Sequence, residues 1–145
     1  MSRSKRLEPV GELLEEAERE CATRLALAQR KAAEAELRCQ ELKRYLAEYQ
    51  GMFQQRASAG MGVSGMRDYQ TFIARLSDAV RQQQELIAQL NSDVERVRLR
   101  WIESAARKSA VGKVIAHARS EDRQLEERRT QQELDERAQH FNGAS

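Results

Sequence analysis

The sequence has few of the residues from which globular cores are built. Aromatic residues make up 5% of the 145 positions, and the chain has one proline and two cysteines. A compact domain of this length would bury more large apolar side chains. What the chain has instead is charge, at 33% of positions, together with much alanine, glutamine and leucine. This composition is typical of a coiled coil or of long helices.

Two further absences restrict the classes of function. No apolar run approaches the roughly 18 residues that span a bilayer, and the basic N-terminus has no apolar region of the secretory kind. We therefore expect no transmembrane segment. The net charge is +2, with both signs mixed along the chain, which argues against nucleic acid as a partner. Steep salt dependence of DNA binding would be the signature of that alternative.

No set of residues suggests chemistry. His117 and His140 are distant from each other, and no Cys/His spacing matches a metal site. Cys21 and Cys39 fall on one predicted helix, ~27 Å apart, too far for a disulfide. We interpret both as small buried residues in a reducing compartment. The sequence predicts no catalytic residue, no cofactor and no metal, and so a protein that is not an enzyme.

A glycine-rich stretch at 57–65 divides the chain. Gly60, Gly62 and Gly65 all fall within it, and glycine is costly inside a helix. We predict a turn there, with Ser64 as the N-cap of the second helix. The stretch also spells G-x-G-x-x-G, but the dinucleotide fingerprint needs a strand before it. A helical pattern precedes it here, which favours a plain turn.

Heptad patterns flank the turn and predict an all-α fold, a long antiparallel two-helix coiled-coil hairpin. We expect one coiled-coil domain over residues 1–145, with helix one at about 8–56 and helix two at about 66–140. Pro9 suits a first helical turn. Residues whose numbers sum to about 122 should face each other, which leaves a C-terminal overhang from about residue 116. In helix one the second seam position passes from Val10 and Ala17 to Leu25, which predicts a stutter.

Near the turn the chain carries more apolar residues than one seam requires. Tyr45 and Phe72 fall one position off the seam and should be partly exposed. Exposed aromatic residues grouped on one face mark partner sites, although a wide core edge remains an alternative. The predicted patch comprises Leu42, Tyr45, Tyr49, Phe72, Leu76 and Ala79.

Three segments resemble the FliJ family of flagellar export components. They are the opening Arg6-Leu7-Glu8-Pro9-Val10, the entry to the second helix at 66–76, and the Glu/Gln/Arg-rich tail at 126–137. The resemblance implies a hairpin similar to the γ-subunit stalk of rotary ATPases. It also implies a cytoplasmic protein, peripheral at the inner face of the inner membrane at the flagellar base.

The same resemblance implies partners. These would be a hexameric export ATPase, which the stalk helps to assemble and activate, the membrane export-gate protein FlhA, and export chaperones that it escorts. The patch near the turn would meet the gate, although Arg38 and Gln83 beside it depart from residues that other members carry. Contacts with the ATPase ring would come from Arg3, Lys5, Arg6, Arg123, Arg128 and Arg129. The alternatives are an injectisome stalk protein or a generic scaffolding or dimerising coiled coil.

Overall fold

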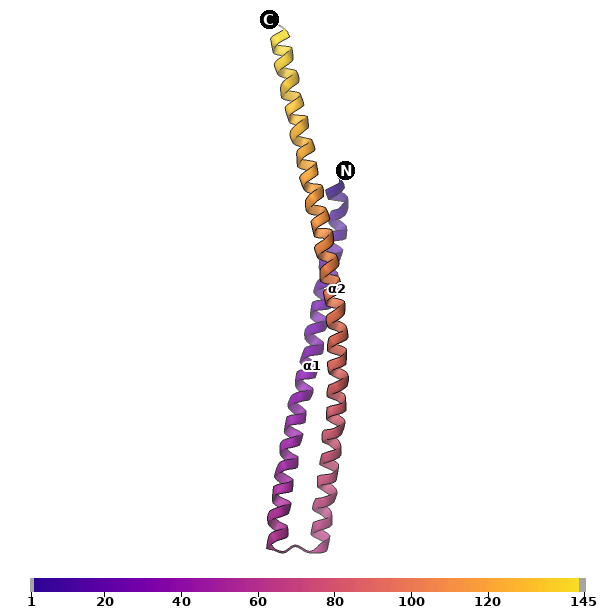
Figure 1. Cartoon of the computed structure of the whole chain (residues 1–145), viewed down its shortest axis with the longest axis vertical. Helices are drawn as coiled ribbons and strands as arrows, with labels where there is room; N and C mark the ends of the chain where they lie inside the picture. The colour runs from indigo at the N-terminus through magenta and orange to yellow at the C-terminus, as the bar shows by residue number, and fades with distance from the viewer. Residues whose placement is uncertain (1, 144–145) are drawn as a thin grey trace. The chain divides into compact units, whose positions relative to one another are not determined.

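The protein consists of two helices joined by three residues. The computed structural model describes residues 2–143, in which α1 spans Arg3–Ala59 and α2 spans Val63–Gly143. The helices pack against each other in opposite directions (Figure 1). The predicted all-α antiparallel hairpin is confirmed. Neither helix, over its described length, contains a stretch apolar enough to cross a lipid bilayer.

The connection between the helices is shorter than the sequence predicted, residues 60–62 rather than 57–65. Gly60 has a φ of 95°, a left-handed conformation that favours glycine. The Met66 amide donates to the Gly62 carbonyl at 3.0 Å, so Gly62 is the N-cap of α2. The prediction of Ser64 as N-cap is wrong, because Ser64 already lies inside the helix. Glycine in place of serine at an N-cap costs only a few tenths of a kcal/mol.

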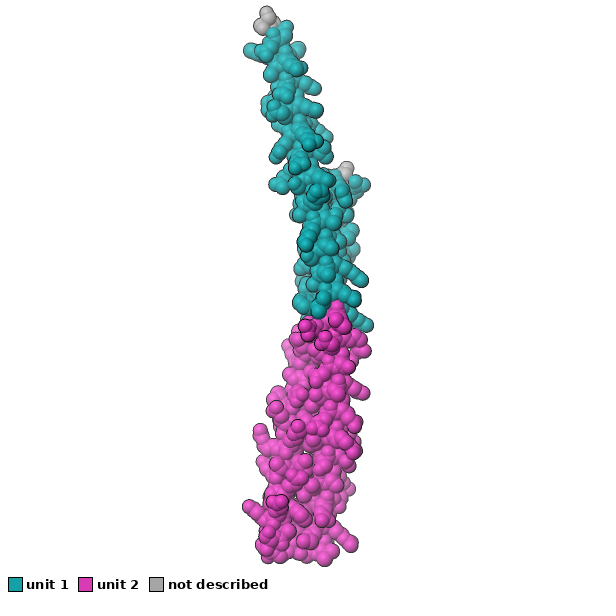
Figure 2. Space-filling view, in the orientation of Figure 1, with its two compact units in different colours: residues 1–22, 100–145 teal, residues 23–99 magenta. Residues whose placement is uncertain are grey.

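The chain falls into two compact units (Figure 2). Unit 1 combines residues 1–22 with residues 100–145, and unit 2 is the hairpin of residues 23–99. Each unit thus contains part of α1 and part of α2. The expectation of one domain over the whole chain stays a prediction.

The core of unit 2 matches the predicted seam. Its buried members are Ala35, Cys39, Val80 and Ile87, against which Leu42, Leu46 and Leu90 pack. The amide of Gln83 donates to the Ala35 carbonyl at 3.1 Å, so this polar seam position is satisfied across the interface. Small residues on α1 thus face larger branched residues on α2, which is complementary packing.

The seam of unit 1 differs from the predicted one. Gly11 and Glu18 are half-buried there, whereas Val10 is 44% exposed and Ala17 is also exposed. The α1 seam therefore alternates spacings of three and four without interruption, through Ser4, Leu7, Gly11, Leu14, Glu18, Cys21 and Leu25. The predicted stutter is wrong. The prediction chose the apolar Val10 and Ala17, whereas the structure half-buries their neighbours Gly11 and Glu18.

The first helix begins at Arg3 rather than near residue 8, and Pro9 lies inside it. Proline removes one backbone hydrogen bond from a helix interior. Local propensity therefore does not account for the helical turn that precedes Pro9. Contacts with α2 do, because Ser4 is buried and hydrogen-bonds Asp122. Helix α1 thus accompanies α2 as far as Asp122, and the overhang begins near residue 123 instead of 116.

Candidate partner-binding surfaces

All six residues of the patch predicted near the turn lie in unit 2. We call them the turn-proximal patch. Three come from α1 and three from α2, and the antiparallel packing brings the two sets together. The rings of Tyr49 and Phe72 are in contact, with centroids 4.5 Å apart and an interplanar angle of 55°. Their numbers add to 121, close to the predicted register.

The patch has an exposed part and a packed part. Tyr45 is 54% exposed and Phe72 is 41% exposed, which confirms the expected exposure of these two side chains. Leu42 packs against the core of unit 2, and Tyr49, Leu76 and Ala79 are half-buried. A partner would therefore meet mainly the two exposed rings, which the packed residues hold in place.

Other apolar and aromatic side chains extend this surface beyond the predicted six. Met52 follows Tyr45 by seven residues, which places both on the same side of α1, and it too is exposed. Closer to the turn, Phe53 contacts Tyr69 with ring centroids 6.0 Å apart. The Arg56 guanidinium lies 5.6 Å from the Tyr69 ring centroid, a cation–π geometry. Sequence reasoning missed Met52, although its heptad spacing from Tyr45 would have found it.

The second surface lies at the terminal end of unit 1. Arg3 pairs with Glu121 at 4.0 Å, and Arg119 donates to Glu8 at 3.3 Å. Between them the Ser4 hydroxyl donates to the Asp122 carboxylate, and this hydrogen bond lowers the pKa of Asp122 below its usual 3.8. The first turn of α1 is thereby attached to α2 by polar contacts.

Beyond Asp122, α2 continues as a single helix. Every described residue from 123 to 143 is exposed, including the three arginines predicted to meet an ATPase: Arg123, Arg128 and Arg129. Of the N-terminal set, Arg3, Lys5 and Arg6 are likewise exposed. The structure thus places both predicted arginine-rich sets in unit 1, one on the paired end and one on the single helix.

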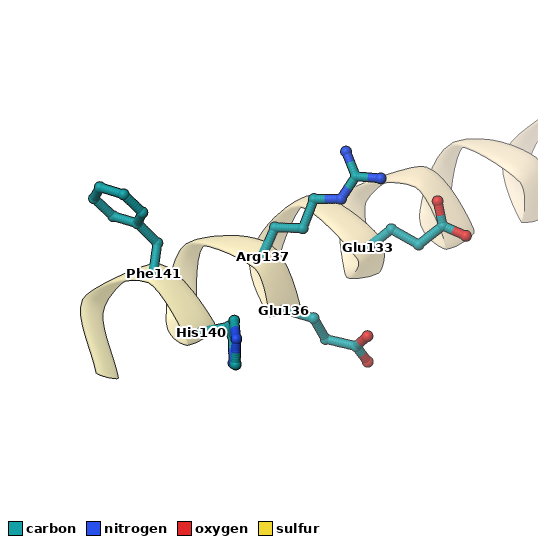
Figure 3. Close-up of a pocket in the computed structure, with 5 residues that line it drawn as sticks. All are labelled: Glu133, Glu136, Arg137, His140 and Phe141. Atoms are coloured by element: carbon teal, nitrogen blue, oxygen red, sulfur yellow. The ribbon is translucent and has the colours of Figure 1, made fainter. Parts of the chain in front are cut away.

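The end of this single helix carries a shallow depression around Glu133, Glu136, Arg137, His140 and Phe141. Figure 3 shows that all five side chains come from α2 and spread around it without converging on one point. Phe141 is 80% exposed. Such a surface offers no enclosure for a small ligand, whose sites are concave and bury most of the ligand.

A polar cluster in unit 1 was not predicted. The Glu18 side chain, only 18% exposed, pairs with Lys108 at 3.7 Å. Its other carboxylate oxygen accepts a 3.0 Å hydrogen bond from the Trp101 indole. The predicted register, in which facing residue numbers sum to about 122, pairs Trp101 with Cys21, and the predicted seam through Ala17 leaves Glu18 off it. The unbroken alternation of three- and four-residue spacings from Ser4 to Leu25 would have placed Glu18 on the seam.

Few of the described side chains are candidates for a metal site or a reactive thiol. Within residues 2–143, no three His, Cys, Asp or Glu side chains gather as a metal site would require. Cys21 and Cys39 are free thiols, half-buried and buried respectively.

Comparison with known proteins identifies the protein family. The sequence model described as "Flagellar FliJ protein" matches residues 3–142. Neither the curated proteins nor the solved structures gave a match. The matched region includes both helices and the turn, as well as both candidate surfaces. The chain therefore belongs to the FliJ family, and its role is related to flagellar protein export.

Proposed function

We propose that this protein is the stalk of a hexameric export ATPase, which it helps to assemble and activate, and that it also contacts the export gate. The observation that carries the proposal is the unequal length of the two helices. The N-terminal turn of α1 contacts α2 at Asp122, where the pairing of the two helices ends. Helix α2 then continues alone to Gly143. A single helix is ~10–12 Å wide with its side chains, narrow enough to enter the centre of a protein ring.

The single helix also needs a partner for its own stability. Isolated helices are marginal in water unless an apolar face packs against something. Residues 123–143 are exposed on all sides, and their charges are of both signs. Attachment to a ring would order this segment. Arg3, Lys5 and Arg6 on α1, with Arg123, Arg128 and Arg129 on α2, are the residues we assign to that contact.

The turn-proximal patch is the surface we assign to the gate protein. Its support is the pair of exposed rings, Tyr45 and Phe72, held by packed neighbours. Aromatic residues with one face supported and one face open are frequent anchors of protein interfaces. The patch belongs to unit 2 and the arginine sets belong to unit 1, so one chain presents separate surfaces to two partners. Escort of export chaperones completes the proposal.

The ATPase contact is tested by mixing the full chain with its cognate ATPase. We expect more hexamers and faster ATP hydrolysis. A chain that ends at Asp122 should lose both effects while keeping the paired part of the hairpin. As a matched control, exchange of the exposed pair Asp78 and Arg81 should change neither. An ATPase rate that the full chain leaves unchanged would refute the stalk role.

The gate contact is tested with Tyr45→Ala/Phe72→Ala and with purified FlhA. The double variant should keep its helicity, measured by circular dichroism, and lose most of its affinity for the gate. Leu37→Ala/Leu99→Ala is the control, because these leucines are also exposed in unit 2 but lie outside the patch. If the tyrosine–phenylalanine variant unfolds, the two rings belong to the core edge rather than to a partner site.

The alternatives differ in simple measurements. An injectisome stalk would be encoded beside virulence secretion genes, whereas the family match here is to a flagellar protein. A dimerising scaffold would pair its helices in parallel between two chains. Cross-links between α1 and α2 within one chain, in the antiparallel register, would separate the hairpin from that scaffold.

A further inference from the structure

The seam of unit 1 is unusual in its polarity. Ser4 and Glu18 on α1, and Asp122 on α2, occupy positions that apolar residues fill in most coiled coils. Lys108 continues the seam spacing of α2 at its rim, with its side chain 44% exposed. In unit 2, by contrast, Gln83 is the only seam residue with a polar aliphatic side chain. The polar seam positions are therefore concentrated where the ends of the two helices meet.

Each of these polar side chains meets a complementary group on the other helix. Ser4 donates to Asp122, and Glu18 accepts from Trp101 and pairs with Lys108. Trp101 and Lys108 are one heptad apart on α2, so the Glu18 carboxylate contacts two positions of α2 that are seven residues apart. No described buried side-chain polar atom is left without a partner.

We propose that Glu18, Trp101 and Lys108 form a register lock that restricts α1 to antiparallel pairing with α2. In a parallel pair of two α1 helices, Glu18 would face its own copy. In a parallel pair of two α2 helices, Lys108 would face Lys108. Like charges at a seam oppose such pairing, whereas one polar contact across a seam can specify register and orientation.

The same contacts select the register in unit 1. A slip of one heptad in one direction places Ile115 beside Glu18 and removes Trp101. A slip in the other direction removes Lys108. Either slip also separates Ser4 from Asp122. An apolar seam would not distinguish these registers, because Leu7, Leu14, Val111 and Ala118 repeat with the same seven-residue period.

The register has a consequence for the proposed stalk, although the lock does not depend on that function. A slip of seven residues would change the length of the single-helix segment by ~10 Å. Together with the three-residue turn that joins the two helices, the lock therefore sets how far α2 extends beyond its partner helix.

The first test uses charge reversal. Glu18→Lys alone places two cations together and should lower the midpoint of thermal unfolding by about 5 °C. Lys108→Glu alone should act similarly. The double variant Glu18→Lys/Lys108→Glu should recover most of that loss. Exchange of the exposed pair Asp78 and Arg81 should leave the midpoint unchanged. Failure of the double variant to recover would show that the Glu18–Lys108 attraction does not lock the register.

The second test removes the lock without unfolding the protein. Glu18→Leu/Lys108→Leu should stay helical, because leucine suits seam positions. Spin labels on cysteines introduced at Arg6 and His117, both exposed in unit 1, report the register by electron–electron distance. The native cysteines, Cys21 and Cys39, would be changed to alanine.

With Glu18 and Lys108 present, we expect one narrow distance distribution at low protein concentration. In the leucine variant we expect a second distance that differs by about one heptad, ~10 Å, or new distances from pairing between chains. A single unchanged distribution in the helical leucine variant would overturn the proposal, because the apolar seam alone would then determine the register.

Discussion

Gly11 and Gly112 are both helical glycines of unit 1, but they differ in their surroundings. A Cβ built on Gly11 would lie 2.8 Å from the Cδ1 atom of Ile115, whereas one built on Gly112 would meet nothing within 4 Å. Ile115 is buried, so its side chain has little free space to move into. Alanine at these two positions should therefore have different effects on stability, although the local helix propensities are alike.

The magnitude follows from two opposing terms. Replacing a helical glycine by alanine stabilises a helix by about 1 kcal/mol. Gly112→Ala should show this gain in full, which raises the midpoint of thermal unfolding by about 4 °C for a chain of this size. In Gly11→Ala, Ile115 must leave its rotamer at a cost of about 1 kcal/mol, so the two terms cancel.

A double-mutant cycle with Ile115→Val isolates the contact, because valine lacks the Cδ1 atom. In the Ile115→Val background, Gly11→Ala should stabilise as much as Gly112→Ala does in the wild type. The assay is urea unfolding followed by circular dichroism, with Gly51→Ala as a second unobstructed control. If Gly11→Ala stabilises the wild type as much as Gly112→Ala does, then the close approach of α1 to Ile115 imposes no constraint.

Three other predictions concern single contacts. The pKa of Asp122 is lowered in the folded state by the Ser4 hydroxyl, so this contact stabilises above about pH 4 and its contribution disappears as the pH falls through the folded pKa. Ser4→Ala should thus be destabilising near neutral pH and neutral in strong acid, as measured by thermal melts at a series of pH values. Gly60→Ala should cost about 1 kcal/mol, because alanine is strained at a φ of 95°; a melt of the full chain measures this cost. Trp101→Phe keeps a six-membered aromatic ring but removes the pyrrole ring that carries the Nε1 donor to Glu18, and urea unfolding should show a loss of about 1.5 kcal/mol.

Periodicity and glycine content were sufficient to predict the hairpin and the apolar seam of unit 2, but not the bounds of its turn. Ala35, Cys39, Val80 and Ile87 recur at heptad spacing, and burial follows that spacing because each helix has one other apolar stripe to meet. The exposure of Tyr45 and Phe72 followed from their positions one residue off the seam. The assignment of those residues to a gate partner remains a proposal.

Unit 1 shows where prediction from pattern alone stops. The choice of Val10 and Ala17 as seam residues followed their apolar character, and the seam instead runs through Gly11 and Glu18. A carboxylate is stable at such a position only when donors from another helix reach it. Trp101 and Lys108 supply those donors from more than 80 residues away, as their numbering shows.

Two helices, the turn between them and the apolar seam near that turn follow from the order of residues alone, because they depend on local propensity and on a seven-residue period. The start of α1 at Arg3, the polar seam of unit 1 and the point where α2 continues alone depend on which side chains meet across the interface. Pro9 and Glu18 each oppose the observed arrangement locally, and only contacts with α2 outweigh them. Those contacts exist only in the folded hairpin.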